Sequence, residues 1–417
     1  MNNTVTGRRL LVAIMALLLV CCKKETADVV LPQVAARPMI LNILDSIDNF
    51  SLFRYAVKKA NLDTAIKSNG NYTVFALDNA SMSAVGLTKD HIDQLNTDTL
   101  NKLISYHIVI GGFPDSVLAQ SPNYVGAQTI RQDVSHTLLT GYRTYRQYLY
   151  IMLQEGKLYV NTQLCNNGEK TVQAGNGYLY TTNRLFSAPV NNLYTIIRSR
   201  PELSLYATAL RIIDSIYNSV RAATTPFPKI LDSPFLASAG IDFQYLNNYF
   251  SGSNAAAGVN IMALPTVLAP VNSAFINAGM NNYTDIKTYC LKRANTMSGI
   301  TAKTTYIGLD SVLKTHILFN PMDQYYDFVF YEQFFRNQAF NNNLHNVSLY
   351  SRMTSSLFPT STTSNNFLRL SIVGDAAFVV PSGNPGITPA RLLADARDML
   401  ATNGIIHEVD RLMPPKP

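Results

Sequence analysis

The chain has 417 residues, of which 47% are hydrophobic and 15% charged, and this composition excludes a disordered chain. The length predicts two or three domains, each able to bury its own core, and the lack of a glycine period excludes a collagen-like chain. The net charge is +7, or +5 without Arg8 and Arg9, and the basic residues are scattered, so we expect no nucleic-acid partner.

The N-terminal segment has the pattern of a secretory signal peptide. Arg8 and Arg9 precede an apolar run, Leu10 to Val20, that is shorter than the roughly 20 residues of a membrane-spanning helix. The run ends in Leu-Val-Cys-Cys followed by two lysines, which resembles the lipobox of bacterial lipoproteins. The resemblance implies a signal peptide over residues 1–21, cleavage before Cys22 and attachment of lipid to the Cys22 thiol.

Two alternatives to this anchor stay open. Cys21 could be the acylated residue, although Val20 would then occupy a position where small residues are preferred, or the segment could be an ordinary secretory signal with two accidental cysteines. With lipid on Cys22, residues 22–38 form an extended tether that contains two prolines. The lipid would attach the protein to a membrane of the cell envelope, and we expect the outer membrane, with the leaflet left open.

Folded sequence is expected to begin at about Met39, where two helical segments follow one another. Apolar residues recur at helical spacing over Ile40–Ile47 and again over Ser51–Ala60, with Ser51 as a plausible N-cap. At a constant offset of 153 the same pattern returns from Leu193 onward. The chain therefore contains an internal repeat.

Three later blocks recur in the same order. They are Tyr72–Met82 with Leu264–Phe275, Leu100–Gly112 with Leu309–Asn320, and Asn176–Pro189 with Asn403–Pro415. The aligned positions are Asn79 with Asn272, His107 with His316, and Arg184 with Arg411, at offsets of 193, 209 and 227. The offset grows only between blocks, which is where surface loops tolerate insertions.

These blocks resemble the fasciclin-like domain, a family of extracellular modules. The family's first box reads similarly to YTVFAPTNxAF, its middle carries a Tyr-His pair after a helix, and its end reads much like NGVIHxIDxVLLPP. This chain departs from the pattern at Leu77, which replaces the usual proline, at Thr315, which replaces the tyrosine before His316, and at Tyr180, which stands where His407 stands in the second copy. The resemblance implies one domain over 39–190 and another, with insertions, over 191–417.

The predicted elements favour an α+β fold, because helical patterns precede strand patterns in each copy. The runs TVFAL and TVLAP suit buried strands, and the asparagine that follows each one is a good helix cap. Tyr148–Leu153 and Lys157–Asn161 read as a hairpin, and Asn403-Gly404 reads as a tight turn. We expect two tandem fasciclin-like domains, each a small β-sandwich or wedge with packed helices.

Two groups of residues are candidates for binding. The Tyr106-His107 pair resembles a motif linked to adhesion in this family, although a histidine beside Ile104 and Ile108 is more simply a hydrogen-bonded core residue. The second group is a tyrosine-rich segment with interleaved arginines, a composition favoured at interfaces: Tyr142, Arg143, Tyr145, Arg146, Tyr148 and Tyr150. The alternative is that these tyrosines line one face of a strand beside a loop.

No catalytic pattern is found in the sequence. His407-Glu408 opens an HExx run, but Arg411 occupies the place of the second histidine and the segment reads as a strand. The six histidines form no local cluster, and Cys165 and Cys290 are expected to be buried free thiols. We therefore expect no enzyme, no metal and no cofactor.

The sequence thus favours a cell-envelope lipoprotein that acts as a binding or adhesion module for a protein or glycan. The alternative is a structural or accessory subunit of an outer-membrane glycan-uptake or assembly complex. The role of the insertion at about residues 214–261 is open, as are the ligand and the oligomeric state.

Overall fold

A computed structural model describes most of the chain between residues 36 and 413. The described ranges are 36–66, 70–121, 124–138, 141–166, 168–223, 250–254, 259–263, 266–294, 309, 312–313, 316–319, 350–351, 368–381, 387–402 and 404–413. The predicted signal peptide, Cys21, Cys22 and nearly all of the tether lie outside these residues. Among the described helices, none has the length and apolar character needed to cross a bilayer.

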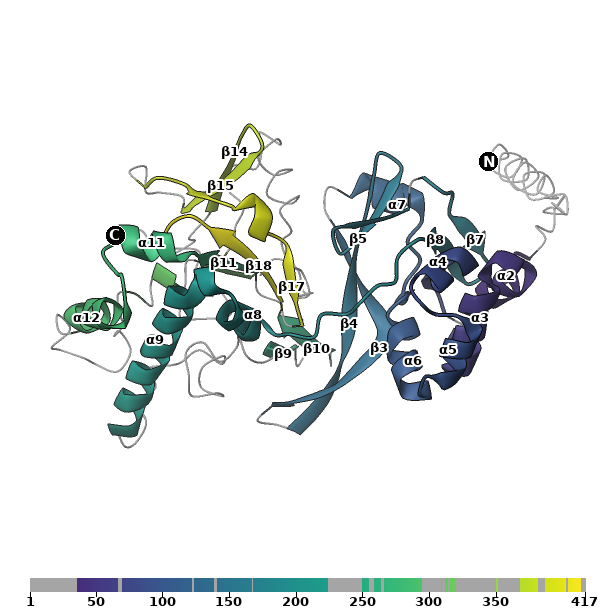
Figure 1. The fold of residues 1–417 in the computed structure, drawn as a ribbon, viewed down its shortest axis with the longest axis horizontal. Helices are drawn as coiled ribbons and strands as arrows, with labels where there is room; N and C mark the ends of the chain where they lie inside the picture. Colours follow the sequence, from purple (N-terminus) through teal and green to yellow (C-terminus); the bar gives the residue numbers. More distant parts are fainter. Residues whose placement is uncertain are drawn as a thin grey trace, which may run out of the picture. The chain divides into compact units, whose positions relative to one another are not determined.

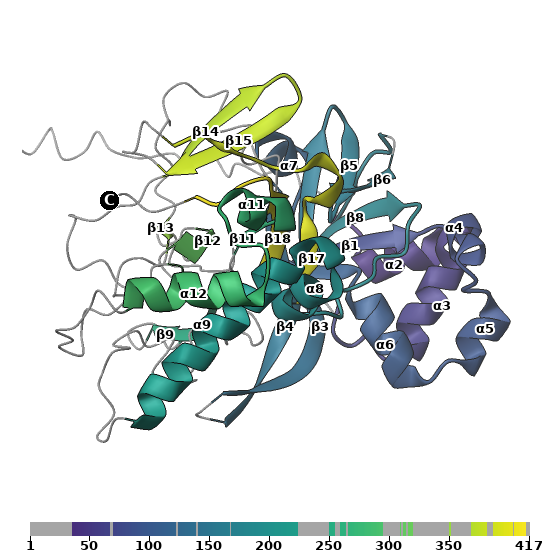
Figure 2. The ribbon, with the colours of Figure 1, turned by 60° about the vertical axis from the view of Figure 1, so that its left-hand side comes forward.

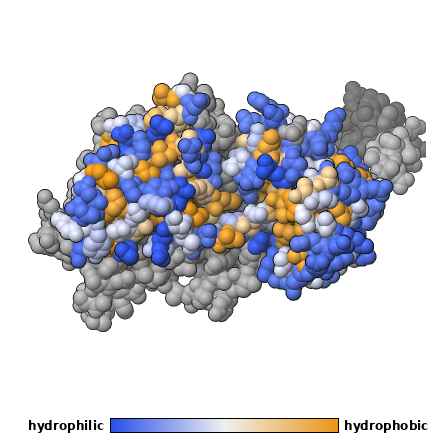
Figure 3. Space-filling view, viewed as in Figure 1, coloured by the Kyte–Doolittle hydropathy of each residue, from blue (hydrophilic) through white to orange (hydrophobic). Residues whose placement is uncertain are grey.

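The first half opens with short helices that bury their apolar faces. They are α2 (Ile40–Ser46), α3 (Ser51–Lys59), α4 (Asn79–Ala84), α5 (Lys89–Gln94), α6 (Thr97–Ser105) and α7 (Asp115–Gln120). In α6 the buried Leu100 and Ile104 are four residues apart and therefore share one face. Hydrophilic residues gather on the surface over α5 and α6 (Figure 3), so these helices are amphipathic, as their spacing predicts.

The strands of the first half form one eight-stranded sheet in the order β6-β5-β4-β3-β2-β1-β8-β7. Figure 1 labels β3, β4, β5, β7 and β8 of this sheet. They are β1 (Tyr72–Leu77), β2 (Ile108–Ile110), β3 (Val125–Leu138), β4 (Gly141–Gln154), β5 (Lys157–Val160), β6 (Gln163–Asn166), β7 (Val172–Ala174) and β8 (Gly177–Thr182). Strands β1 and β8 are parallel, and the other neighbours are antiparallel. The predicted β4–β5 hairpin is confirmed, and β4 begins at Gly141.

Strand β1 is buried on both faces, which explains its nearly unbroken apolar sequence. Val74 and Ala76 pack in a cluster with the helices α2, α3 and α6. Phe75, whose side chain points to the opposite face, packs in a second cluster with Leu149 and Ile151 of β4. The sheet therefore covers two cores, one under the helices and one between β1–β2 and β4–β5.

A glycine is required where β8 begins. Gly177 has φ +139°, and a Cβ at this position would lie 1.8 Å from the carbonyl oxygen of Tyr72 on β1. The preceding Asn176 is buried, accepts from the Ile40 amide at 2.8 Å and donates to the Ile66 carbonyl at 2.9 Å. The Asn-Gly pair therefore joins the helical segment to the sheet.

The second half repeats this order of elements, as far as it is described. Its helices are α8 (Leu193–Ser199), α9 (Ser204–Ala223), α11 (Asn272–Asn277) and α12 (Tyr283–Ala294). Its strands are β9 (Phe250–Asn254), β10 (Val259–Ala263), β11 (Thr266–Pro270), β12 (Ile317–Phe319), β13 (Tyr350–Ser351), β14 (Leu368–Val373), β15 (Ala376–Pro381), β16 (Ala390–Arg391), β17 (Met399–Ala401) and β18 (Gly404–Val409). Figure 2 shows α9 and α12 beside the strands β11 and β12.

Strand registers confirm the alignment of the two copies. Phe75 pairs with Tyr180 across β1 and β8, and Leu268 pairs with His407 across β11 and β18. Both pairings are parallel, and both fit the offsets of 193 and 227 read from the sequence. The α+β fold and the shared framework of the two copies are thus confirmed.

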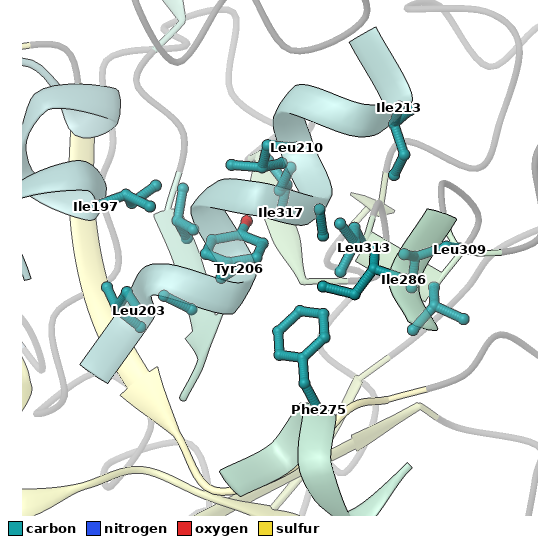
Figure 4. Packing of buried hydrophobic residues seen from close by; sticks show 14 of the residues in the cluster. Ile197, Leu203, Tyr206, Leu210, Ile213, Phe275, Ile286, Leu309, Leu313 and Ile317 are labelled. Atoms are coloured by element: carbon teal, nitrogen blue, oxygen red, sulfur yellow. The ribbon is translucent and has the colours of Figure 1, made fainter. Parts of the chain in front are cut away.

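The second half has its own hydrophobic cluster, in which residues of α8 and α9 pack against β11, α11 and β12 (Figure 4). Tyr206, Phe275 and Ile317 lie at its centre, and all are fully buried. Its members lie between Leu193 and Leu412, whereas the two clusters of the first half use residues from Ile40 to Ala188. Cys165 and Cys290 are buried and form no disulfide bond in the described part of the chain, as predicted.

The insertion predicted at about residues 214–261 starts as regular structure. Helix α9 continues through it to Ala223, so the front helix of the second copy is longer than its counterpart α3. The strands β9 and β10 pair antiparallel at the far end of the insertion. Residues 224–249 lie outside the described residues.

Candidate functional site

The Tyr106-His107 pair lies where α6 ends and β2 begins, and both side chains are fully buried. Helix α6 brings the pair against β1, because the His107 carbonyl accepts from the Phe75 amide at 2.9 Å. The pair is therefore held in the core of the first repeat and is not displayed on its surface.

Both ring nitrogens of His107 contact backbone groups. Nδ1 lies 3.0 Å from the Phe75 carbonyl oxygen, and Nε2 accepts from the Phe186 amide at 3.0 Å. A carbonyl oxygen can only accept, so Nδ1 carries the proton and the ring is neutral. The ring also stacks on Phe186, with centroids 4.4 Å apart. Burial lowers the pKa of His107 from 6.5 to about 4.

His316 makes the same two backbone contacts in the second repeat. Its Nδ1 lies 2.8 Å from the Leu268 carbonyl oxygen, and its Nε2 accepts from the Met413 amide at 2.8 Å. The side chain is fully buried, and burial lowers its pKa from 6.5 to about 4. Each histidine therefore joins a central strand to the C-terminal segment of its own repeat.

Tyr106 connects α6 to the β4–β5 hairpin. Its hydroxyl donates to the Tyr148 carbonyl at 2.9 Å and accepts from Nδ2 of Asn161 at 3.0 Å. The guanidinium of Arg131 lies 5.9 Å from the centre of its ring. These contacts give Tyr106 a structural role in the first repeat. The aligned residue in the second repeat is Thr315.

Tyr148 is not the exposed contact residue that the sequence suggested. It is only 8% exposed and packs in a cluster with Tyr124, Tyr150 and Met152. Its ring lies 6.2 Å from that of Tyr150, and its hydroxyl accepts from Nε2 of Gln128 at 2.6 Å. We therefore expect Tyr148→Ala to lower the stability of the protein, because truncation would open a cavity in this cluster.

Tyr142 and Tyr145 lie on the distal part of β4. Tyr142 pairs with Thr137 of β3, and Tyr145 pairs with Asp133. Their side chains lie outside the described residues, so their role in binding stays a prediction. The structure thus brings Tyr106, His107 and Tyr148 together in a buried region, and it places Tyr142 and Tyr145 further along the hairpin.

The asparagine of the first box has a function that the sequence analysis missed. Asn79 is not the N-cap of α4, because Asp78 is, and the Asp78 side chain accepts from the Ser81 amide. The Asn79 side chain instead caps α3: its Oδ1 accepts from the Leu52 amide at 2.9 Å, and its Nδ2 donates to Oγ of Ser51 at 3.0 Å. Ser51 is likewise the first helical residue of α3 and not its N-cap.

Asn272 makes the same contacts in the second repeat. Its Oδ1 accepts from the Leu205 amide at 2.9 Å, and its Nδ2 donates to Oγ of Ser204 at 3.0 Å. The recurrence of Asn at an offset of 193 indicated a shared role for Asn79 and Asn272. A side chain that caps a helix far away in sequence cannot, however, be recognised from local spacing.

The His407-Glu408 pair contacts other groups of the second repeat. They lie on β18 and are almost fully buried; the Asp398 amide donates to Nδ1 of His407 at 3.2 Å, and Glu408 forms a salt bridge with Arg200. Burial raises the pKa of the Glu408 carboxyl, and Arg200 opposes this effect. Among the described residues no three His, Cys, Asp or Glu side chains are grouped so that they could hold a metal ion.

Comparison with protein-family models bears on the first repeat. Residues 48–188 match the family model described as Fasciclin domain, which confirms the resemblance for the first repeat. Fasciclin domains are associated with cell adhesion and binding. Among solved structures, the chain is similar to a FAS1 domain pair from the insect cell adhesion molecule fasciclin I, with 12% identity, coverage of 89% of this chain and 95% of that chain, and a TM-score of 0.32. No curated protein gives a significant match.

Proposed function

We propose that this protein is a cell-envelope lipoprotein that binds a protein or glycan ligand and catalyses no reaction. The observation that supports this most strongly is that His107 and His316 each engage both ring nitrogens with the backbone of their own repeat. A histidine that acts as a general base or metal ligand needs a free nitrogen. The fasciclin family match of residues 48–188 supports a binding role as well.

The test of binding uses the intact lipoprotein, cross-linked in its own membranes and then purified. We expect a defined protein or glycan to be recovered with it, and free glycan of the same kind to compete if the ligand is a glycan. Recovery of an outer-membrane protein complex with no separate ligand would favour the accessory-subunit role instead. Turnover of a recovered compound by the purified protein would overturn the proposal.

The membrane anchor is proposed to be a lipid on Cys22, because this cysteine ends the lipobox-like run Leu-Val-Cys-Cys. Cys22→Ala should abolish labelling by a palmitate analogue and move the protein out of the detergent phase. Cys21→Ala is the matched control, and it should be labelled and partition like the natural protein. Detergent partition of the Cys22→Ala protein would refute the anchor, and loss of label only in Cys21→Ala would move it to Cys21.

A further inference from the structure

We infer that the outer edge of β4, from Tyr142 to Arg146, is a strand-addition site for an extended, acidic segment of a partner protein. The inference rests on the proposed binding function and names the kind of ligand and the part of the first repeat that takes it. It follows from how β3 and β4 pair, from the direction of the backbone groups of β4, and from the charge of the segment Gly141–Leu149.

Strands β3 and β4 are far longer than their neighbours. Each has 14 residues, whereas β5 on the other side of β4 has four. Strand β5 pairs with β4 only from Ile151 to Gln154. In the described part of the chain the sheet order places β3 and β5 alone beside β4. The two long strands therefore continue as a ribbon beyond the rest of the sheet, as Figure 1 shows.

The backbone of β4 shows which residues face its outer edge. The Tyr150 amide donates to Oδ1 of Asn161 and its carbonyl accepts from the Asn161 amide, so both groups of Tyr150 point away from β3. The Gln147 carbonyl points the other way, since it accepts from Oγ1 of Thr129 on β3. In an antiparallel strand the direction alternates with each residue. The amides and carbonyls of Tyr142, Thr144 and Arg146 therefore lie on the outer edge.

The edge of β4 is regular, whereas the edge of β3 is not. Between the pairs Gln128–Tyr148 and Gln132–Arg146, β3 advances by four residues while β4 advances by only two. The register shifts again between Asp133 and His136 on β3. The extra residues thus form bulges on β3, and bulges protect an edge against pairing with another chain. The sequence GYRTYRQYL from Gly141 to Leu149 has no proline and no lysine, which are other common forms of protection.

The charge of this segment indicates the partner. Between Gly141 and Leu149 the chain has Arg143 and Arg146 and no carboxylate, so this segment of β4 has a charge of +2. An added strand with acidic residues would be attracted to these charges, whereas a basic strand would be repelled. The amides and carbonyls on the edge recur every second residue, a repeat that an extended peptide backbone matches.

The test measures fluorescence anisotropy of two labelled ten-residue peptides with the intact mature protein. One peptide alternates Glu with Val or Thr, and the other has Lys in place of Glu. We expect the acidic peptide to bind at least tenfold more tightly than the basic one, and more weakly as salt rises. Equal binding of both peptides, or binding of neither, would overturn the inference. Competition by neutral oligosaccharides would also overturn it, since it indicates a glycan site.

Two variants locate the site. Thr144→Pro removes an amide from the outer edge and should weaken binding of the acidic peptide at least tenfold, whereas Thr144→Val keeps the amide and should bind as the natural protein does. Arg146→Glu gives a second readout if proline unfolds the ribbon, because with Arg143 it leaves no net charge on the segment and should abolish the preference for the acidic peptide. Unchanged preference in Arg146→Glu, or unchanged affinity in a folded Thr144→Pro protein, contradicts the site.

The same variants separate this inference from the proposed function. If Thr144→Pro still recovers the natural partner from membranes, binding occurs elsewhere and only the strand-addition site is wrong. If the natural protein recovers no partner or ligand at all, the proposed function itself fails.

Discussion

The amide of Phe186 donates to Nε2 of His107, 3.0 Å away and 79 residues earlier in the chain. The contact attaches the segment after β8 to the start of β2, and the other ring nitrogen reaches the carbonyl of Phe75 on β1. One imidazole thus joins three segments that are distant in sequence. Met413 and His316 form the same contact at 2.8 Å in the second repeat.

We predict that each histidine stabilises its own repeat. His107→Ala and His316→Ala leave a buried amide and a buried carbonyl without partners, so each should lower the free energy of unfolding by roughly 1–3 kcal/mol. Urea unfolding of the intact mature protein measures this loss. His91→Ala is the control, because His91 is exposed on α5 and its loss should change little.

A different result would restore the adhesion role of the Tyr-His pair. If His107→Ala leaves the unfolding midpoint unchanged and still abolishes attachment to the partner, the pair is the binding site after all. Loss of both stability and attachment would be uninformative for this residue alone, so His316→Ala serves as the comparison, since it lacks the neighbouring tyrosine.

The two histidines also predict a loss of stability in acid. Their pKa is about 4 in the folded protein and 6.5 when unfolded, so between these values the unfolded chain binds more protons than the folded one. The two neutral histidines therefore make their full contribution to the free energy of unfolding above pH 6.5, and this contribution is lost as the pH falls toward 4. The difference corresponds to roughly 3 kcal/mol for each repeat.

Unfolding midpoints measured in urea between pH 7.5 and 4 check this prediction. His107→Gln and His316→Gln, combined, remove both titrating groups and should flatten the decline. If the natural protein and the double variant lose stability in parallel between pH 6.5 and 4, other groups cause the decline and the assignment is wrong.

The sequence predicted the framework because the framework depends on local patterns. The apolar spacing of Ile40–Ile47, the strand runs at β1 and β11, and the offsets between copies all involve short segments, and strand pairing confirms them. The role of Asn79 could not be predicted, because its partners lie on α3 and in the turn before it, up to 31 residues earlier. The burial of Tyr148 could not be predicted either. Tyr148 and Leu149 point to opposite faces of β4, and the sequence does not show that both faces are covered.

Tyr206 provides a test of core packing in the second repeat. It aligns with Phe53 of the first repeat, and its hydroxyl is buried in an apolar cluster with no hydrogen-bond partner among the described residues. Tyr206→Phe should therefore raise the free energy of unfolding by roughly 1 kcal/mol, because it removes an uncompensated buried polar group. The reverse change at the aligned position, Phe53→Tyr, should lower it, since Phe53 is also fully buried.

Thermal unfolding of the two variants gives the comparison. A lower midpoint for Tyr206→Phe would mean that the hydroxyl has a partner in the folded protein, such as a bound water molecule. A neutral result for Phe53→Tyr would mean that the first core can accommodate a hydroxyl without loss.

The last prediction concerns the division into residues 39–190 and 191–417. Three of the hydrophobic clusters among the described residues each draw their buried residues from one side of this boundary, and each side contains its own backbone-bonded core histidine and its own parallel strand pair. A fragment with a complete core and framework should fold alone. We therefore expect both fragments to unfold cooperatively in urea, with denaturant slopes that sum to about that of the whole chain, because the slope scales with the surface exposed.

The matched control is a cut at Asp133, within β3, which divides the first core and should give no cooperative transition for the N-terminal piece. Cooperative unfolding of the whole chain with none in either fragment would show that the two halves form a single folding unit.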